Sequence, residues 1–268
     1  MTTLPYEPSL YAPECLAEVL PSPSAVDDAA VESYLEDGYL AVANLFDPEE
    51  VAAEIERVEA IAAGDLAQID EGVSPTGPDA KASDRVRKLC VKPAQSRELG
   101  LPVDHPKLME LVQKLMSGRE PALFQSMALL KPPHGGGEKP WHQDHAYFNV
   151  PVGQRIVGVW IALDAATVSN GCMQMLPGQH HDGPVPHFKR RDWQMCDTDV
   201  LGQGSVAAEL EPGGVLFFDS LLPHGTPMNN STDRRRALQF HYAPKDAPDW
   251  THEQRMAVFG SEGRDVEC

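Results

Sequence analysis

The octapeptide W-H-Q-D-H-A-Y-F at 141–148 places two histidines and a carboxylate within four residues. In an extended strand, residues i and i+2 point to the same side, so His142 and Asp144 would share one face and Gln143 would point away. One imidazole and one carboxylate can hold a divalent metal if a third ligand comes from elsewhere. Two histidines and a carboxylate with open coordination positions are typical of non-haem Fe(II) oxygenases. The same residues could also form a solvated turn in which Asp144 pairs with a nearby base.

A second stretch, F-F-D-S-L-L-P-H-G-T at 217–226, contains a candidate third ligand, because His224 follows an apolar run. Arg235 comes shortly afterwards, in D-R-R-R-A-L. If a strand begins there, alternation turns Arg235 inward and its two neighbours outward. A guanidinium binds a carboxylate through two parallel hydrogen bonds, as a cosubstrate with a free carboxylate would require. The three consecutive arginines could instead be the charged start of a strand.

The elements that must position these residues change in character near residue 120. Upstream, capping residues and apolar spacing predict helices at about 27–37, 48–63 and 105–117. The polar segment 64–84, which contains Gly and Pro, is expected to be a loop.

Downstream, short apolar runs alternate with turn signals such as P-P-H-G-G-G, S-N-G and E-P-G-G. This pattern predicts many short strands in a β-sandwich or barrel. The predicted strands lie at 122–131, 155–164, 172–177, 214–219 and 236–242. We therefore expect one domain over 1–268, made of an extended arm at 1–24, a helical layer at 25–120 and a β core at 121–244.

Composition narrows the possible partners. The net charge of −18 disfavours nucleic acid and anionic membranes, which need a basic surface. No run of about eighteen apolar residues is present, and no basic stretch followed by an apolar one opens the chain, so neither a membrane span nor a secretory signal is expected. The cysteines are scattered without C-x-x-C, which favours reduced thiols. We expect a cytoplasmic protein, monomeric or homodimeric, with a small-molecule substrate.

Seven motifs between about 120 and 244, in their order and spacing, resemble the phytanoyl-CoA dioxygenase family of Fe(II)- and 2-oxoglutarate-dependent oxygenases. The motifs are Q-S-M-A-L-L-K-P-P, W-H-Q-D-H-A-Y-F, G-V-W-I-A-L-D, S-N-G-C-M, L-P-G-Q-H, F-F-D-S-L-L-P-H-G-T and R-R-A-L-Q-F-H-Y. The resemblance covers nearly half of the chain. It implies a mainly β fold with flanking helices, in which a double-stranded β-helix (a cupin-like jelly roll) carries an α-helical N-terminal layer.

The resemblance also implies a role for each matched residue. The iron ligands of the family match His142, Asp144 and His224, and the residue that binds the distal carboxylate of 2-oxoglutarate matches Arg235. Four further cosubstrate contacts match Lys88, Met127, Trp160 and Thr226. Instead of contacting a cosubstrate, Lys88 could be an ordinary surface lysine, and Met127 and Trp160 could be ordinary core residues.

The implied activity is hydroxylation, or another oxidation, of a small molecule that consumes O2 and releases succinate and CO2. Because Asp144 is present where a small residue would let a halide bind the iron, hydroxylation is favoured over halogenation. One alternative is a cupin-like metal enzyme that does not use 2-oxoglutarate, which Arg235 and Thr226 argue against. Another is a non-catalytic metal-binding or sensor protein on the same fold. The sequence leaves the identity of the substrate open.

Overall fold

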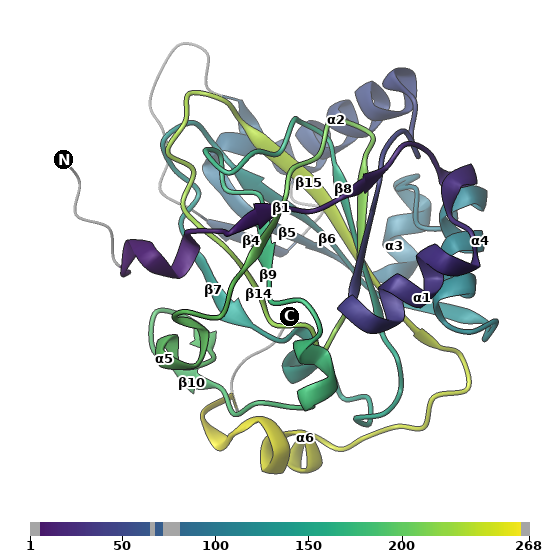
Figure 1. Cartoon of the computed structure of the whole chain (residues 1–268). Helices are drawn as coiled ribbons and strands as arrows, with labels where there is room; N and C mark the ends of the chain where they lie inside the picture. Colours follow the sequence, from purple (N-terminus) through teal and green to yellow (C-terminus); the bar gives the residue numbers. More distant parts are fainter. Residues whose placement is uncertain (1–5, 65–67, 72–80, 264–268) are drawn as a thin grey trace.

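Two β-sheets build the core of the protein in a computed structural model that describes residues 6–64, 68–71 and 81–263 (Figure 1). The larger sheet has the order β2 (Val19–Leu20), β3 (Tyr39–Val42), β13 (Val215–Asp219), β8 (Val157–Ala162), β15 (Arg235–Pro244), β6 (Pro121–Lys131), β5 (Val86–Val91) and β4 (Gln68–Glu71). The smaller sheet has the order β1 (Cys15–Leu16), β12 (Val206–Ala208), β9 (Met173–Met175), β14 (His224–Thr226) and β7 (Lys139–His142). A separate hairpin joins β10 (Phe188–Lys189) to β11 (Trp193–Gln194). All five strands predicted downstream of residue 120 are therefore confirmed.

Most helices precede the β core in the chain. They are α1 (Asp28–Asp37), α2 (Pro48–Ala63), α3 (Pro93–Glu98) and α4 (Pro106–Leu115), with α5 (Asp197–Val200) and α6 (His252–Phe259) further on. Short 3₁₀ turns are η1 (Pro8–Tyr11), η2 (Pro23–Ala25), η3 (Ala82–Arg85), η4 (Asp144–Tyr147), η5 (Gln179–Asp182) and η6 (Ser261–Gly263). Helices α1, α3 and α4 gather on one side of the strands, and α6 lies apart from them at the lower edge of Figure 1. None of the helices in the described part of the chain is long and apolar enough to cross a membrane.

The three predicted helices are confirmed, and their ends follow from local capping. The Asp27 side chain accepts the Ala30 backbone N–H at the start of α1, and Gly38 ends that helix at a φ of 83°. Asp47 and Glu50 form a reciprocal capping box at the start of α2.

The expected loop at 64–84 is wrong in its described part, because β4 and the beginning of η3 lie within it. Strand β5 and helix α3 were not expected either. Strand β5 pairs with β6, and β4 pairs with β5, so this segment extends the larger sheet. Residues 65–67 and 72–80 of the predicted loop lie outside the described residues.

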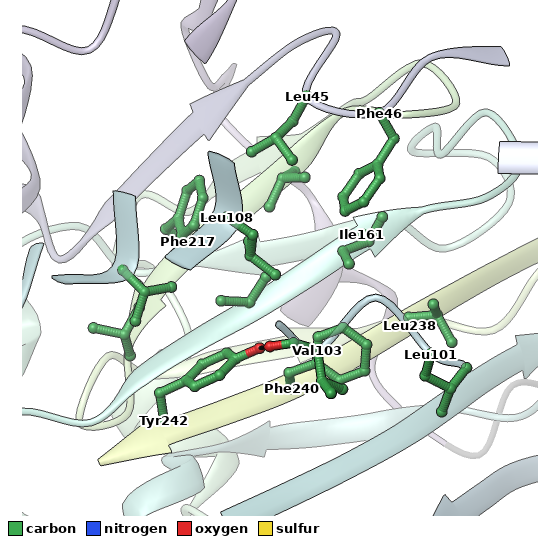
Figure 2. Close-up of a cluster of buried hydrophobic side chains, with 14 of the residues drawn as sticks. Leu45, Phe46, Leu101, Val103, Leu108, Ile161, Phe217, Leu238, Phe240 and Tyr242 are labelled. Carbon is green, nitrogen blue, oxygen red and sulfur yellow. Dashed lines mark hydrogen bonds between the residues drawn. The ribbon is translucent and has the colours of Figure 1, made fainter. Parts of the chain in front are cut away.

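The apolar core lies between the helices and the outer face of the larger sheet (Figure 2). On β15, Leu238, Phe240 and Tyr242 belong to this core, and the Tyr242 hydroxyl donates to the Val103 carbonyl at 2.6 Å. Strand alternation therefore turns Arg235 and every second residue after it toward the space between the two sheets. The side chains on that inner face can serve a site because the outer face already supplies the apolar packing.

A second apolar cluster fills part of the space between the sheets and supports the residues that follow β13. The Phe218 ring packs against Gly158, where an added Cβ would lie 2.4 Å from the ring. The same ring lies edge-on to the imidazole of His224, with centroids 4.9 Å apart. Gly158 thus makes room for the ring that backs one of the predicted metal ligands.

Candidate active site

His142, Asp144 and His224, hereafter the triad, meet between the two sheets as their spacing predicts. His142 ends β7 and is paired in register with His224 at the start of β14. Asp144 begins η4, but the intervening Gln143 is extended (φ −107°, ψ 126°), so His142 and Asp144 still project to one side. One potential ligand atom from each member of the triad lies within 4.8 Å of the others. Asp144 Oδ1 is 3.1 Å from His142 Nε2, and Asp144 Oδ2 is 3.5 Å from His224 Nε2.

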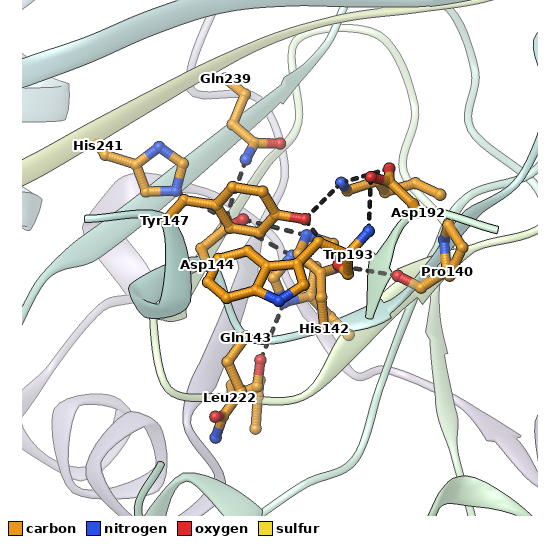
Figure 3. A network of polar contacts seen from close by, with 12 residues as sticks. Pro140, His142, Gln143, Asp144, Tyr147, Asp192, Trp193, Leu222, Gln239 and His241 are labelled. Atoms are coloured by element: carbon orange, nitrogen blue, oxygen red, sulfur yellow. Dashed lines mark hydrogen bonds and ion pairs between the residues drawn. The ribbon is translucent and has the colours of Figure 1, made fainter. Parts of the chain in front are cut away.

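The hydrogen bonds around the triad suit a divalent metal ion. Nδ1 of His142 donates to the Pro140 carbonyl at 2.7 Å, and Nδ1 of His224 donates to the Leu222 carbonyl at 2.9 Å (Figure 3). In the neutral rings, Nε2 then carries a lone pair that faces the Asp144 carboxylate. Acceptors that face one another in a buried space are satisfied by a metal ion or a proton between them, and second hydrogen bonds of this kind are usual for metal-binding histidines.

Electrostatics favour the protonation states that metal binding needs. Burial lowers the pKa of His224 to about 3, which keeps this imidazole neutral. Burial alone would raise the pKa of Asp144, but the neighbouring histidines His224, His241 and His142 lower it well below its usual range. A neutral imidazole and an ionised carboxylate are the forms that bind a metal.

Two side chains of β15 hold Asp144 from the other side, and the sequence reasoning did not anticipate them. Nε2 of His241 and Nε2 of Gln239 lie 2.8 Å and 3.1 Å from Asp144 Oδ2. A usable signal was present, because Gln239 and His241 lie four and six residues after Arg235 and therefore share its face of the strand.

Gln143 and His145 point away from the triad and tie its turn to the surrounding chain. The Gln143 amide donates to the carbonyls of Gly183 and Leu221. Both ring nitrogens of His145 are occupied, one by the Ser220 hydroxyl and the other by a backbone carbonyl. The short 3₁₀ turn that carries Asp144 is thus held in place at several points.

A cavity of about 90 Å³ extends from the triad along β15 to Arg235. Besides the triad, it is lined by Arg87, Lys88, Met127, Leu129, Leu130, Lys131, Gly136, Glu138, Lys139, Tyr147, Met173, Thr226, Arg235 and Gln239. Five of these residues are basic, whereas Glu138 and Asp144 are its only acidic residues among those described. The chain as a whole has 40 acidic and 22 basic residues, so the cavity reverses the overall balance of charge.

Arg235 is a buried cation without a carboxylate partner among the described residues. Its side chain is 2% exposed, and its Nε has no hydrogen-bond partner within the described chain. The guanidinium makes one long hydrogen bond, to the Leu129 carbonyl at 3.5 Å, and lies 5.4 Å from the ring centre of Trp160. Burial lowers the pKa of Arg235 to about 10. A buried cation of this kind calls for an anion.

The arginines on either side of Arg235 face outward, as alternation predicts. Arg234 forms an ion pair with Asp84 at 2.8 Å, and Arg236 forms one with Asp164 at 2.7 Å. Among the three arginines, only the central one reaches the cavity.

The remaining predicted cosubstrate contacts take different positions. Lys88, Met127 and Thr226 line the cavity with Arg235. Trp160 is not among the lining residues and lies beside the guanidinium of Arg235 instead. A direct contact between Trp160 and a cosubstrate stays a prediction, and the ring positions Arg235 from behind.

Lys131 is a second buried basic residue of the cavity, which the sequence reasoning missed. Burial and the nearby Arg235 lower the pKa of Lys131 well below its usual range. Its Nζ donates to the carbonyls of Gly136, Gly137 and Pro227. Gly136 has a φ of 72°, and an added Cβ would lie 2.5 Å from the Lys131 Cα. The glycine-rich turn after β6 therefore folds back over this lysine and closes the cavity there.

A polar network closes the cavity next to the triad. The Lys139 ammonium donates to the Tyr147 hydroxyl at 2.9 Å and to Asp192 at 2.8 Å, and the Tyr147 hydroxyl donates to the Trp193 carbonyl (Figure 3). These contacts hold the β10–β11 hairpin against β7. The Tyr147 ring also lies edge-on to His142, with centroids 5.8 Å apart.

Comparison with known proteins agrees with this geometry. The sequence model of a family described as phytanoyl-CoA dioxygenase (PhyH) matches residues 34–237. The chain is 31% identical over 157 residues to phytanoyl-CoA dioxygenase domain-containing protein 1 of Danio rerio, an alignment that covers 55% of this chain and 53% of that protein. It is 29% identical over 221 residues to ectoine dioxygenase of Bordetella parapertussis, which covers 75% of this chain and 70% of that protein. The chain thus spans about half the length of the first of these relatives.

Among solved structures, EvdO2 from Micromonospora carbonacea var. aurantiaca, crystallised with 2-oxoglutarate, superimposes with a TM-score of 0.67 at 24% identity. The superposition covers 84% of this chain and 93% of EvdO2. The expected fold, a jelly-roll core of mainly β structure with flanking helices, is confirmed by this likeness.

Proposed function

Since this chain belongs to the phytanoyl-CoA dioxygenase family, we propose that it is an Fe(II)- and 2-oxoglutarate-dependent oxygenase that hydroxylates, or otherwise oxidises, a small molecule. The observation that carries this proposal is the pairing of two features in one cavity. The triad lies at one end, and the buried, carboxylate-free Arg235 lies further along the same wall. A keto acid that chelates a metal and also carries a distal carboxylate fits both features.

Each residue of the site has a defined task in this proposal. The triad holds Fe(II) on one face, and the bonds from Nδ1 of the two histidines to backbone carbonyls keep the metal-binding nitrogens aimed inward. Arg235 binds the distal carboxylate of 2-oxoglutarate, Thr226 donates its hydroxyl to the same group, and Lys88 and Met127 line the wall beside it. Iron with 2-oxoglutarate supplies the activation of O2 and the release of succinate and CO2.

The charge of the cavity supports an anionic cosubstrate. Arg235 is a buried cation that has no carboxylate partner among the described residues. A carboxylate that enters this space offsets a charge that the fold leaves unpaired. The net charge of −18 disfavours nucleic acid as a partner, so we place the reaction on a small molecule, in a cytoplasmic monomer or homodimer.

The test is an anaerobic titration of metal-free protein with Fe(II) and then with 2-oxoglutarate. The signal to monitor is the weak visible charge-transfer band of the iron–2-oxoglutarate chelate. We expect the band in the parent protein and its loss in His142→Ala and Asp144→Ala. Iron binding without a band would favour a cupin-like enzyme that does not use 2-oxoglutarate. Oxygen uptake that does not depend on 2-oxoglutarate would point the same way, and a band without any oxygen uptake across a substrate panel would favour a sensor.

A further inference from the structure

We propose that His241 and Gln239 form a carboxylate clamp that restricts Asp144 to one metal-binding oxygen, an inference that rests on the proposed function. The clamp is made of two side chains on the same face of β15, and each contacts Asp144; His241 does not belong to the cluster of three residues that could hold a metal. Both are positioning residues, because they act on the metal through Asp144.

The two oxygens of Asp144 have different surroundings. Oδ2 accepts one hydrogen bond from His241 at 2.8 Å and another from Gln239 at 3.1 Å. A carboxylate oxygen has two lone-pair sites, so these two donors fill both sites of Oδ2. Oδ1 lies 3.1 Å from Nε2 of His142 and remains available to a metal, whereas Oδ2, although 3.5 Å from Nε2 of His224, already accepts the two hydrogen bonds of the clamp. The carboxylate is therefore presented through one oxygen only.

His241 is built to donate its proton to Asp144 and to nothing else. The side chain is fully buried, and its Nδ1 has no hydrogen-bond partner within the described chain. Aromatic rings surround it, with the centroids of Phe148 at 4.8 Å, Phe218 at 5.9 Å and Phe124 at 6.1 Å. An N–H at Nδ1 would be unsatisfied among these rings, which favours the tautomer that carries its proton on Nε2.

The clamp is rigid because of its place in the sheet. Strand β15 is paired on both sides, with Gln239 opposite Met127 of β6 and Trp160 of β8. The same strand carries Arg235, four residues before Gln239. One stiff strand thus sets the spacing between the anchor for the cosubstrate and the carboxylate that holds the metal.

A single-oxygen ligand has a functional consequence. Two histidines, one carboxylate oxygen and a keto acid that binds through two atoms would together supply five of the six ligand atoms that a divalent iron site can take. A second oxygen from Asp144 would compete for the remaining position. The clamp therefore keeps the site open, and it also improves metal affinity by holding the ligand in its binding orientation, an effect for which outer hydrogen-bonding partners typically contribute about 10- to 100-fold.

The test uses the metal-free full chain and Co(II) alone, with affinity measured by titration and coordination by the visible absorption of the bound ion. His241→Phe and Gln239→Leu should each weaken Co(II) binding by about 10- to 100-fold and change the shape and intensity of the absorption bands. His241→Gln, which keeps a donor near the same place, should restore most of the affinity. The matched control is Gln125→Leu, because Gln125 is the register partner of His241 and is buried but does not contact Asp144. Thermal unfolding of each metal-free variant separates loss of fold from loss of metal affinity.

Three outcomes overturn the clamp. His241→Phe and Gln239→Leu could bind Co(II) as the parent does, with the same spectrum. Gln125→Leu could lose as much affinity as they do. The parent could fail to bind Co(II) at all, which would remove the proposed function as well. If Co(II) binding follows the expected pattern but 2-oxoglutarate gives no charge-transfer band with Fe(II), the clamp stands and the proposed function fails.

Discussion

Replacing Arg235 with methionine should make the cosubstrate-free protein more stable while removing its response to 2-oxoglutarate. Burial lowers the pKa of Arg235 to about 10 from 12.5, and the group is charged at neutral pH in the folded and unfolded states alike. At about 1.36 kcal/mol per pKa unit, the buried charge costs the folded state roughly 3 kcal/mol. Loss of the contact between the guanidinium and the Trp160 ring should destabilise the variant by about 1 kcal/mol. The net gain of roughly 2 kcal/mol corresponds to about 4–8 °C in Tm for a chain of this size.

The same substitution should abolish tight binding of the cosubstrate. Hydrogen bonds to charged groups contribute about 1.5–3 kcal/mol each, so loss of a bidentate pair should weaken 2-oxoglutarate binding by roughly a hundredfold or more. Arg235→Lys keeps the charge but not the planar fork, and should bind 2-oxoglutarate with intermediate affinity.

The assay is anaerobic thermal unfolding, with and without Fe(II) and with increasing 2-oxoglutarate. Arg234→Met is the matched control, because Arg234 is the adjacent arginine but faces outward to Asp84. This control should be slightly less stable than the parent and should keep the normal response to 2-oxoglutarate. The reasoning fails if Arg235→Met is less stable than the parent without cosubstrate, or if 2-oxoglutarate still raises its Tm by the parental amount.

Three further predictions follow from single features. Alanine at any member of the triad should prevent retention of Fe(II) on anaerobic dialysis, and full retention by all three variants would contradict the assignment of the metal site. Burial would raise the pKa of Asp192, but Lys139 lowers it to about 2, so this carboxylate stabilises the fold above about pH 3.8 and loses that effect as the pH falls toward 2. Asp192→Asn should therefore be less stable than the parent in urea at pH 6, by about 1–2 kcal/mol, and should approach it near pH 2; an equal deficit at both pH values would show that Lys139 is not the cause. Gly171 and Gly118 have similar positive φ angles, 85° and 82°. A Cβ added at Gly171 would lie 2.6 Å from the Pro227 carbonyl oxygen, whereas a Cβ added at Gly118 would have no atom within 4 Å. Urea unfolding should give a loss of about 1 kcal/mol for Gly118→Ala and at least about 2 kcal/mol for Gly171→Ala, and equal losses would rule out the steric clash.

The helices of this protein could be predicted from the sequence because their signals are local. Asp27 and Gly38 bracket α1, and Asp47 with Glu50 begins α2, so caps within a few residues determine where these helices start and stop. The five strands after residue 120 were equally accessible, because apolar runs between turn residues need no information from distant parts of the chain.

Strands β4 and β5 were missed for a physical reason. Lys88 on β5 faces the cavity and Leu89 faces the apolar core, so the strand carries charged residues on the inner side of the protein, where a buried strand is expected to be apolar. Such a segment resembles a solvated loop in the sequence, and only its pairing with β6 identifies it as part of the sheet.

The sequence by itself determined the chemistry available to this protein: a histidine and a carboxylate two residues apart, a later histidine, and an arginine at the start of an alternating strand. It also determined that Arg235 would face inward and its neighbours outward. Only the tertiary structure decided that Gln239 and His241 meet Asp144, that Lys131 is held by three carbonyls, and that Trp160 lies behind Arg235 instead of lining the cavity. Apart from the bonds of Lys131 to the nearby Gly136 and Gly137, these contacts join residues about 75 to 97 positions apart. Such long-range contacts are set by strand register and by the packing of one sheet on the other.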